Sequence, residues 1–573
     1  MRGRRVAVLG GGVSGLTAAM ELAERGFEVT VVEAGALGGK ARSMPVPGTG
    51  RDGRRDLPGE HGFRFFPGFY RNLPVTMSRI PFPGNPDGVG VAGNLVETSE
   101  VLHARGDGRD GLVLDVSGDG REPDLEETLR SLGAFLSQAR GLSAAESEYF
   151  ANRLLVYATS GDERRAGQWE HTSWWEFSGA RGASEEYYRL CVIGPSRSLV
   201  AAKAEVASAE SIARTQTEFW YGLLGRKRYA AADRVLNAPT NEAWIDPWVR
   251  HLKGLGVRFA LGRRAVKLEL TRGEVSAVLL GRADGTTDRW EADWFVCAVP
   301  AERAVKLLDA EVLARDPALG GAARLETDWM TGLQFYLRHR TPIAHGHVIY
   351  LDSPWALTSV SQAQFWAGVD FAATYGDGEV QDCLSVDISA WDVPGPLFGK
   401  AAWDCTRKEV AAEVWHQMCQ ALNREGETVL SEKLLHSWFL DPAVTGLDGP
   451  GRARNSEPLL ISTAGSAQHR PRAATALPNL FLAGDWVHSD LNLATMEAAD
   501  QTGKAAANAL LTAAAVRDAV PCEILTMQHP PELAELHRID ARLYAAGLPN
   551  MFDRPAPWAT GSGQPAGNAS PAG

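Results

Sequence analysis

A glycine-rich turn between two apolar segments constrains the fold of this chain more than any other part of its sequence. The apolar residues 6–9 run directly into GGGVSG at residues 10–15, and a second apolar run, residues 28–32, ends on Glu33. This order predicts a strand, a tight turn, a helix and a parallel second strand, the unit that binds dinucleotides. A carboxylate at the end of that second strand accepts hydrogen bonds from ribose hydroxyls and repels a 2′-phosphate, which disfavours NADP.

Each residue of the turn has a physical task in that unit. Gly10 permits the tight turn, Gly12 lets a pyrophosphate approach the backbone, and Gly15 lets the helix pack closely on the strand. Val13 and Ser14 open the helix, whose free N–H groups and positive dipole end face the anion. We therefore expect a nucleotide site here.

Length, charge and cysteine content restrict the class of protein. The chain has 573 residues, which predicts two or three domains, and its net charge of -12 argues against a nucleic-acid partner. The six cysteines show no regular spacing, so we expect a reducing compartment with no disulfide or zinc framework. His345 and His347 have ligand-like spacing, but no third ligand is evident in the sequence, and we assign no metal.

Hydropathy restricts the cellular location. No apolar run approaches 18 residues, and no signal-peptide pattern precedes the first strand. We expect a cytoplasmic protein without a membrane span, and peripheral membrane contact stays open for a lipid-soluble substrate.

Strand and turn signals recur in three separated stretches of the chain. They return between residues 256 and 300 and again at residues 480–485, whereas the stretches between them are irregular and rich in helix and tryptophan signals. We predict an α/β fold with a Rossmann-like nucleotide domain built from three segments and an inserted domain with a mixed sheet and helices. The expected boundaries are 1–73, 234–309 and 456–516 for the first domain, 74–233 and 310–455 for the second, 517–554 for a C-terminal extension, and 555–573 for a disordered tail.

A second motif near the end of the chain indicates which dinucleotide binds. The strand signal ends on Gly484 and Asp485, and a helix begins close to Thr495 and Met496. A carboxylate and a helix start so far from the first motif suit FAD, whose ribityl chain and flavin ring extend away from the adenine end. Small residues let this helix start lie against the ring, where its dipole stabilises negative charge on reduced flavin. These residues are Ala494, Ala498 and Ala499.

With these motifs the chain resembles the superfamily of phytoene desaturases and flavin-containing amine oxidases. The resemblance rests on the first fingerprint with Glu33, on GGKAR at residues 38–42, on EHG at residues 60–62, and on AGD and MEAA at residues 483–485 and 496–499. This chain departs from the family's usual Met-Glu-Gly-Ala, because it has Ala498 in place of the glycine. Residues 60–70 are most similar to the hydroxysqualene dehydroxylase and carotene desaturase branch.

The resemblance implies where the cofactor would lie. Gly39 and Arg42 would follow the pyrophosphate and ribityl chain, Val266 would contact the adenine, and residues 62–64 would pass near the flavin. The full set of cofactor-binding residues implied in this way adds Ala34, Gly38, Lys40, Ala41, Gly62, Phe63, Arg64, Gly484, Asp485, Ala494, Thr495, Met496 and Ala499.

Two branches of that superfamily, the amine oxidases and the desaturases, imply different chemistry. Amine oxidases often carry a lysine in the strand that enters the substrate domain, but Gly332 falls at about that place, and the Ser-Gly-Gly-Cys-Tyr pattern of covalent flavin attachment is missing. We therefore expect noncovalent FAD and a hydride transfer at a carbon of an apolar, isoprenoid-like substrate, with an unknown electron acceptor. A peroxide-releasing amine oxidase stays as an alternative. The second alternative is a binding protein without flavin, like the Rab GDP-dissociation inhibitors, which resemble this superfamily in fold.

Few side chains suggest themselves for the reaction. His61 and Arg64 are candidates for acid–base work, although Glu60 and Arg64 equally suit an ion pair that anchors the loop. Four tryptophans of the second insertion suit an apolar pocket with cation–π capacity: Trp366, Trp391, Trp403 and Trp438. Of these, Trp391 and Trp438 are the catalytic candidates.

Overall fold

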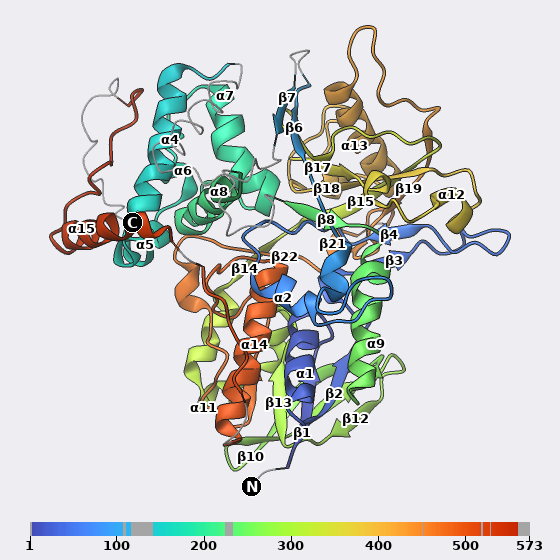
Figure 1. Cartoon of the computed structure of the whole chain (residues 1–573), viewed down its shortest axis with the longest axis vertical. Coiled ribbons are helices and arrows are strands. Elements are labelled where there is room, and N and C mark those ends of the chain that lie inside the picture. Colours follow the sequence, from blue (N-terminus) through green and yellow to red (C-terminus); the bar gives the residue numbers. More distant parts are fainter. Residues whose placement is uncertain are drawn as a thin grey trace.

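The computed structural model divides into a lower part built on a parallel sheet, an upper helical part and an upper part built on a large mixed sheet (Figure 1). The structure describes residues 3–106, 111–115, 141–223, 233–449, 451–516, 520–527 and 529–559. The N-terminus lies at the bottom of the view and the C-terminal segment beside the helical part (Figure 1).

The lower part is built on a parallel sheet whose strands come from three distant segments. Each strand pairs in parallel with its neighbours, and Val8 lies between Val31 and Val296 in the register. Valine-rich strands that are buried on both faces are typical of such sheets. The prediction of a three-segment Rossmann-like domain is confirmed, while the exact domain boundaries stay a prediction. The order is β23 (Leu480–Leu482), β13 (Trp294–Cys297), β1 (Arg5–Leu9), β2 (Glu28–Glu33), β9 (Arg258–Leu261).

Helices from both ends of the chain cover one face of this sheet. α1 (Val13–Glu24) packs against α14 (Met496–Ala513), and Thr17 Oγ1 donates to Asp500 Oδ1 at 2.7 Å. α9 (Asp246–Gly254) joins them in one hydrophobic core. A side chain at Gly503 would place Cβ 2.6 Å from Ser14 O, so glycine permits the close contact. Gly26, with φ +78°, follows the end of α1 as a helix stop.

The opposite face carries a small antiparallel sheet and two short helices. They enclose a second core with residues from the same parallel strands, among them Leu9 and Phe295. These elements are β10 (Arg264–Thr271), β11 (Glu274–Gly281), β12 (Thr287–Trp290), α10 (Ala301–Leu307) and α11 (Ala310–Arg315).

The upper sheet is mixed and has seven strands. β6 and β16 pair in parallel, and the other neighbours are antiparallel. α13 (Arg407–Leu422) begins at a capping box of Thr406 and Glu409 and packs its apolar side on the sheet. The order is β19 (Leu435–Leu440), β15 (Thr331–Leu337), β18 (Asp382–Ile388), β17 (Thr358–Ser361), β16 (Gly346–Tyr350), β6 (Glu100–Ala104), β7 (Leu112–Asp115).

Short strand pairs and two short helices lie outside the two large sheets. They bring residues 58–60 and 234–236 to the junction between the upper and lower parts. The pairs are β3 (Ser43–Pro45) with β4 (Pro58–Glu60), β5 (Leu95–Glu97) with β8 (Arg234–Leu236), β14 (Glu326–Asp328) with β22 (Leu459–Ile461), and β20 (Val444–Thr445) with β21 (Arg454–Asn455); the helices are α2 (Asn72–Ser78) and α12 (Phe371–Thr374).

The helical part has its own aromatic core and holds the C-terminal segment. Trp558 Nε1 donates to Gly179 O at 3.0 Å, and its ring lies 5.0 Å from those of Tyr149 and Tyr187. The prediction of disorder is therefore wrong for residues 555–559, because an aromatic side chain anchors them; residues 560–573 lie outside the described residues. The helices are α4 (Ala144–Thr159), α5 (Asp162–Gly167), α6 (Trp174–Phe177), α7 (Glu185–Tyr187), α8 (Ala209–Leu223) and α15 (Ala534–Ala545), with a π-helical stretch at Tyr188–Ser198.

Candidate functional site

The turn after β1 leaves room for a phosphate group against the backbone. Gly10 has φ +113°, and a Cβ there would lie 2.6 Å from Ala298 O, while a Cβ on Gly15 would lie 2.0 Å from Gly10 O. By contrast, a Cβ on Gly12 would meet its nearest atom, Cα of Gly39, only at 3.7 Å. The packing of the protein itself thus requires glycine at positions 10 and 15. Gly12, by contrast, keeps space free beside the turn.

The start of α1 supplies hydrogen-bond donors to that space. Gly12 is the N-cap residue and has no side chain to occupy the free N–H groups of the first turn, which begins at Val13 and Ser14. That turn carries no acidic residue. An anion is therefore the natural ligand of this helix end, and the pyrophosphate of a dinucleotide fits the cradle.

A second glycine-rich turn lies against the first. Glu33 Oε2 accepts a hydrogen bond from Gly11 N–H at 2.8 Å and Oε1 accepts one from Gly35 N–H at 2.7 Å, which holds the carboxylate at the end of β2. Gly38 has φ +98° and donates its N–H to Gly11 O at 2.8 Å, while Ala34 is exposed. The residues predicted for the adenosine end of the cofactor are thus brought together.

Lys40 and Arg42 follow on the same turn, on either side of the buried Ala41. Arg42 makes two hydrogen bonds to the carboxylate of Glu457, at 2.9 and 3.1 Å. Lys40 Nζ lies 3.2 Å from Glu302 Oε1. Both cations are thus already paired with carboxylates, and their predicted contact with the cofactor stays a prediction.

Gly484 and Asp485 lie where β23 ends beside the glycine turn. Gly484 has φ +130°, and its N–H and its carbonyl oxygen both bond the Thr502 hydroxyl of α14 at 3.0 Å. The backbone oxygen of Asp485 accepts a hydrogen bond from Arg470, and burial lowers the pKa of that arginine to about 10. The charge of the half-buried Asp485 carboxylate partly offsets the effect of burial on the Arg470 pKa.

The start of α14 reaches a large cavity. The Thr495 hydroxyl caps the helix by accepting the N–H of Ala498 at 3.0 Å, and Ala499 packs against the core of the lower part. Ala494, Thr495 and Met496 line the cavity, as do Phe63 and Arg64 from the N-terminal segment. The two segments that the sequence predicted to meet near a flavin ring therefore do meet.

Val266 lies away from both segments, on β10. The register of β10 with β11 shifts between Ala265 and Lys267, so Val266 has no partner opposite it, and its side chain is 41% exposed. A bulge of this kind leaves backbone groups unpaired. The contact of Val266 with the adenine stays a prediction. In this structure the group available for such a contact is the unpaired backbone of Val266 rather than its side chain.

The cavity has a volume of about 350 Å³ and is enclosed by the helical part, the mixed sheet and the start of α14. Most of its wall is apolar, which suits an apolar ligand. The apolar wall consists of Phe63, Phe65, Val101, Leu112, Phe150, Leu190, Pro195, Leu199, Val200, Phe219, Trp220, Met330, Ile349, Leu351, Leu459, Leu460, Leu493 and Met496.

One side of the cavity is polar, and the sequence predicted only one residue of it. Six lining residues each have a buried polar atom without a hydrogen-bond partner in the part of the chain that the structure describes. Such atoms destabilise a protein unless a ligand or water satisfies them. They are Arg64 Nε, His103 Nδ1, Asp233 Oδ1, His347 Nε2, Thr358 Oγ1 and Asp387 Oδ1.

Burial shifts the pKa values of this polar wall. It raises the pKa of the Asp387 carboxyl to about 7, against the opposing charge of Arg64, and lowers the pKa of His103 to about 4. Burial likewise raises the pKa of Glu60 to about 7, although Thr240 donates to both its oxygens, and lowers the pKa of Arg64. Arg64 thus lies in the field of two buried carboxyls, a setting typical of functional sites.

Three residues predicted to be catalytic do not line the cavity. Trp391 is fully buried in the core of the mixed sheet, with Nε1 donating to Ile388 O at 3.2 Å, and Trp438 lies opposite Phe335 in the pairing of β19 with β15. Trp391 is a core residue, and Trp438 is half-buried against the same core. A tryptophan in the sequence indicates burial but not which side of a sheet is buried. His61 Nδ1 lies 2.5 Å from Asp441 Oδ2, and His61 does not line the cavity.

Gly332 on β15 is covered by the chain itself. A Cβ at this position would lie 2.9 Å from Glu60 O and 2.9 Å from both the N and Cα of Gly62. The segment that carries Arg64 therefore crosses over the strand at a point where any side chain would collide with it.

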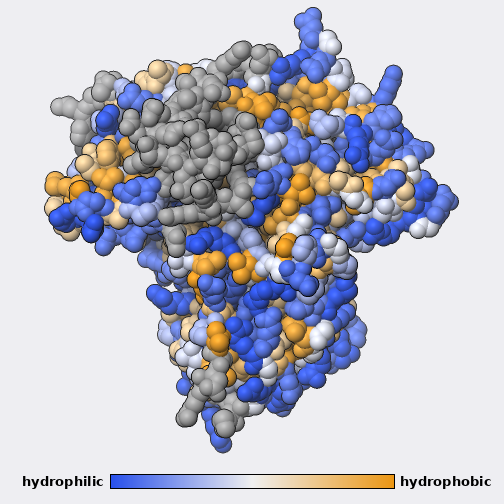
Figure 2. Space-filling model, viewed as in Figure 1, coloured by the Kyte–Doolittle hydropathy of each residue, from blue (hydrophilic) through white to orange (hydrophobic). Residues whose placement is uncertain are grey.

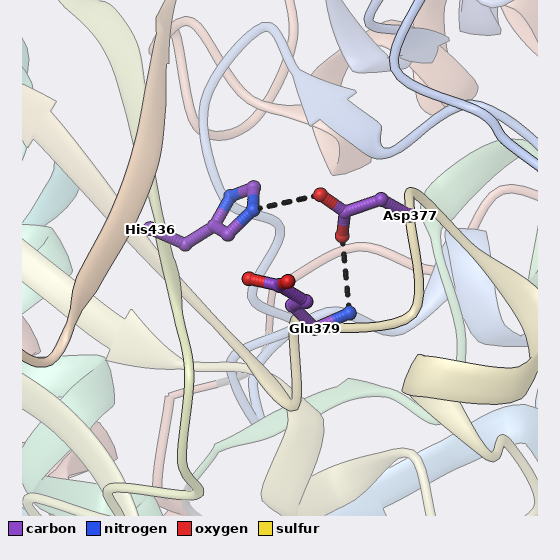
Figure 3. A group of neighbouring side chains, drawn as sticks. All are labelled: Asp377, Glu379 and His436. Carbon is purple, nitrogen blue, oxygen red and sulfur yellow. Dashed lines mark hydrogen bonds and ion pairs between the residues drawn. The ribbon is translucent and has the colours of Figure 1, made fainter.

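Three potential metal ligands, Asp377, Glu379 and His436, lie together and do not line the cavity (Figure 3). His436 Nε2 lies 3.0 Å from Asp377 Oδ2, Asp377 also accepts the Glu379 N–H at 3.0 Å, and Glu379 pairs with Arg338. These mutual contacts account for the grouping without an ion.

The surface of the molecule mixes polar and apolar residues. On the face in Figure 2, hydrophilic residues predominate over the lower part and hydrophobic ones are scattered among them. Within the described ranges, no helix is both long and apolar enough to cross a membrane.

The chain matches a known family over most of its length. The profile of the family described as flavin containing amine oxidoreductase matches residues 13–511. A curated relative, the carotenoid phi-ring synthase of Chlorobaculum tepidum, is 27% identical over 289 residues, which are 49% of this chain and 41% of the relative. Protoporphyrinogen oxidase 2 of Arabidopsis thaliana is 63% identical over 43 residues, 7% of this chain and 8% of that protein. The chain thus spans less than half the length of these relatives.

Solved structures share the fold at low sequence identity. A putrescine oxidase is 13% identical with a TM-score of 0.55, and the match covers 90% of this chain and 98% of that one. Cyclohexylamine oxidase from Brevibacterium oxydans IH-35A is 14% identical with a TM-score of 0.54, over 89% and 99% of the two chains. An oxidoreductase from Methanosarcina mazei is 13% identical with a TM-score of 0.54, over 87% and 98%.

Proposed function

Because this chain belongs to the family of flavin-containing amine oxidoreductases, we propose that it holds FAD noncovalently and transfers hydride at a carbon of an apolar, isoprenoid-like substrate. The observation that carries the proposal is the cavity of about 350 Å³, whose wall is mostly apolar and which reaches both segments predicted to flank the flavin. Desaturation and dehydroxylation are the reactions of this kind that we favour.

The residues around the glycine turns fit the cofactor. Gly12 and the start of α1 would hold the pyrophosphate, Glu33 the adenosine ribose, and Asp485 with the start of α14 the flavin end. FAD would supply the hydride chemistry, for which the protein provides binding and orientation. The sequence lacks the Ser-Gly-Gly-Cys-Tyr pattern of covalent flavin attachment, which supports noncovalent binding.

The apolar wall would position the substrate and exclude water. A mostly hydrocarbon molecule gains about 25 cal/mol for each Å² of apolar surface that it buries, so such a wall can supply affinity without many hydrogen bonds. Correct placement of a reactive carbon then supplies much of the rate enhancement. The relative that modifies a carotenoid supports an apolar substrate for the same reason, although it shares only part of its length with this chain.

The amine oxidase alternative has one observation in its favour. Asp233 and Asp387 place two buried carboxyl groups on the cavity wall, and a carboxylate suits an ammonium group. Against it, Gly332 stands at about the place where amine oxidases often carry a lysine, and the chain crossing at Glu60 and Gly62 leaves no room for a side chain there.

The test begins with the spectrum of the purified protein. Absorption at the flavin maxima, and release of free FAD on heat denaturation, would support noncovalent FAD; a colourless protein that does not bind added FAD would favour a binding protein without flavin. Bleaching of that spectrum under anaerobic conditions by an isoprenoid substrate, or turnover of an isoprenoid alcohol by the reduced protein, would support the favoured reaction. Peroxide release with putrescine or cyclohexylamine in air would overturn it in favour of the amine oxidase.

A further inference from the structure

Polar side chains form a row on the cavity face of the mixed sheet. In the register, Ile349 of β16 lies opposite both His103 of β6 and Thr358 of β17, and Thr358 lies opposite Asp387 of β18. Side chains of paired residues share a face of the sheet, and so does His347, two residues before Ile349. The row therefore places hydrogen-bonding groups from four strands beside an otherwise apolar cavity.

His347 is fixed in orientation by its neighbours. Its Nδ1 lies 2.7 Å from Asp233 Oδ2, the same oxygen that the Thr98 hydroxyl contacts at 3.3 Å. Its ring packs against Phe63 and Phe65, with centroids 5.3 and 5.1 Å apart. A carboxylate at Nδ1 holds the proton on that nitrogen, which leaves Nε2 as the atom that can exchange a proton.

That Nε2 atom is buried and has no partner among the described residues. It shares the wall with atoms that can only donate, such as Arg64 Nε, and with carboxylate atoms that accept, such as Asp387 Oδ1. A hydrocarbon would leave all of them unsatisfied, at about 1–3 kcal/mol for each buried group. An ammonium group can only donate and would satisfy only the acceptors. A hydroxyl has one donor and two acceptor positions, so it matches the mixed set.

We propose that His347 is a catalytic residue that exchanges a proton, through Nε2, with the hydroxyl group of an otherwise apolar substrate, and that Asp233 is the positioning residue that holds its ring. This inference rests on the proposed function, which places an apolar substrate in the cavity. In the step the Nε2–H bond of the doubly protonated ring breaks, its electron pair stays on nitrogen, the proton forms an O–H bond to the substrate oxygen, and the ring is left in the neutral Nδ1–H form. The Nδ1 proton stays hydrogen-bonded to Asp233 throughout.

Four titratable or charged groups face His347 from the elements around it. They are Asp233 ahead of β8, Asp387 on β18, His103 on β6 and Arg64 in the segment that crosses the sheet. Because burial keeps the pKa of His103 at about 4, this second histidine is neutral near pH 7. Burial raises the pKa of Asp387 to about 7, so an Asp387→Asn variant shows which part of any pH dependence comes from that carboxyl.

The first experiment compares a hydroxyl-bearing probe with a hydrocarbon of the same chain. Binding of farnesol and of farnesene to the FAD-loaded protein is measured by calorimetry in the wild type and in His347→Gln. We expect farnesol to bind about tenfold more tightly in the wild type, which corresponds to about 1.4 kcal/mol. In His347→Gln that ratio should fall below about threefold, because a neutral amide replaces the imidazole.

His345→Gln is the matched control, because His345 bonds the Ser99 hydroxyl at 2.9 Å and does not line the cavity. It should keep the tenfold ratio. If neither probe binds the wild type, the proposed function itself fails. If both bind but equally well, or if His347→Gln keeps the ratio, this inference is overturned while the proposed function stands. Tighter binding of farnesylamine than of farnesol, unaffected by His347→Gln, would also overturn it.

The second experiment tests the positioning role of Asp233 without turnover. In protein labelled with ¹⁵N-histidine, the His347 signals are identified by their loss in His347→Gln. We expect them to report the Nδ1-protonated neutral form in the wild type at high pH and a mixture of tautomers in Asp233→Asn. An unchanged tautomer in a folded Asp233→Asn variant would refute the positioning role.

Discussion

Replacing Gly12 by valine should abolish cofactor binding without harming the fold. Gly12 has φ -78° and ψ -176°, an extended conformation that suits a β-branched residue. Its Cβ would meet Gly39 Cα at an ordinary 3.7 Å, so the added atoms extend into the space beside the turn rather than into the core. That space is where the pyrophosphate of FAD must approach the backbone.

The magnitude follows from ligand linkage. A ligand that binds only the folded state at 100 times its dissociation constant stabilises that state by about 2.7 kcal/mol. The wild type should gain that amount from FAD, and Gly12→Val should gain nothing. The free energy of unfolding of the apoprotein should change by less than about 1 kcal/mol, because no contact of the described core is lost.

Thermal unfolding with and without added FAD measures both quantities. Gly15→Ala is the contrasting variant, because its Cβ would lie 2.0 Å from Gly10 O. It should lower the unfolding temperature of the apoprotein itself, by about 3 kcal/mol or more in free energy. Gly12→Val protein that is purified with a full complement of FAD and shows the wild-type FAD shift would refute the placement of the pyrophosphate.

Three further predictions concern the upper part. Gly332→Lys should lower the free energy of unfolding by about 3 kcal/mol or more, because even its Cβ would lie 2.9 Å from Glu60 O; an unchanged thermal midpoint would contradict the chain crossing. Burial raises the pKa of Glu60 from 4.5 to about 7, so the folded protein keeps a proton that the unfolded chain loses, and stability falls as the pH rises through that window. Glu60→Gln should remove this fall and gain about 1–3 kcal/mol over the wild type at pH 8 but little at pH 4, in denaturant titrations; an equal fall in both proteins would be the opposing result. Trp391→Phe should leave farnesol affinity within about twofold, whereas Trp220→Ala on the cavity wall should weaken it by about tenfold; calorimetry on both variants decides.

The parts of the fold that the sequence predicts are those with local signals. β1, the turn at Gly10 and β2 follow one another within a short stretch, and the turn requires glycine for reasons of backbone geometry that are visible in the sequence. The sequence predicts a helix that begins close to Thr495, and the structure has Thr495 as the N-cap of α14, where its hydroxyl accepts the Ala498 N–H.

The polar wall of the cavity could not be predicted in the same way. Asp233, His347 and Asp387 are far apart in the chain and meet only through the pairing of strands, whose register a single sequence does not specify. The alternation of residues 346–350 could have placed His347 and Ile349 on one face, but not which face lines a cavity. Trp391 and Trp438 show the converse, since their size indicated burial and gave no information about the side on which they are buried.

The same uncertainty applied to Glu497. Glu497 lies within the family-like MEAA sequence but was not among the residues predicted to bind the cofactor, and its carboxylate accepts the N–H groups of Asn72 at 2.7 Å and Leu73 at 2.9 Å and so caps α2. It joins the C-terminal helix to the N-terminal segment, a structural task that only the assembled molecule reveals.

The strand order of the parallel sheet has a consequence during biosynthesis. β1 finds β2 soon after both are made, but its other neighbour, β13, ends at residue 297, and the outermost strand, β23, ends at residue 482. At translation rates of about 5–20 residues per second, roughly 25–95 s pass between the appearance of β1 and that of β23 on the ribosome. For that interval an unfinished sheet edge stays available for mispairing, so a nascent chain of this protein is a natural client for chaperones.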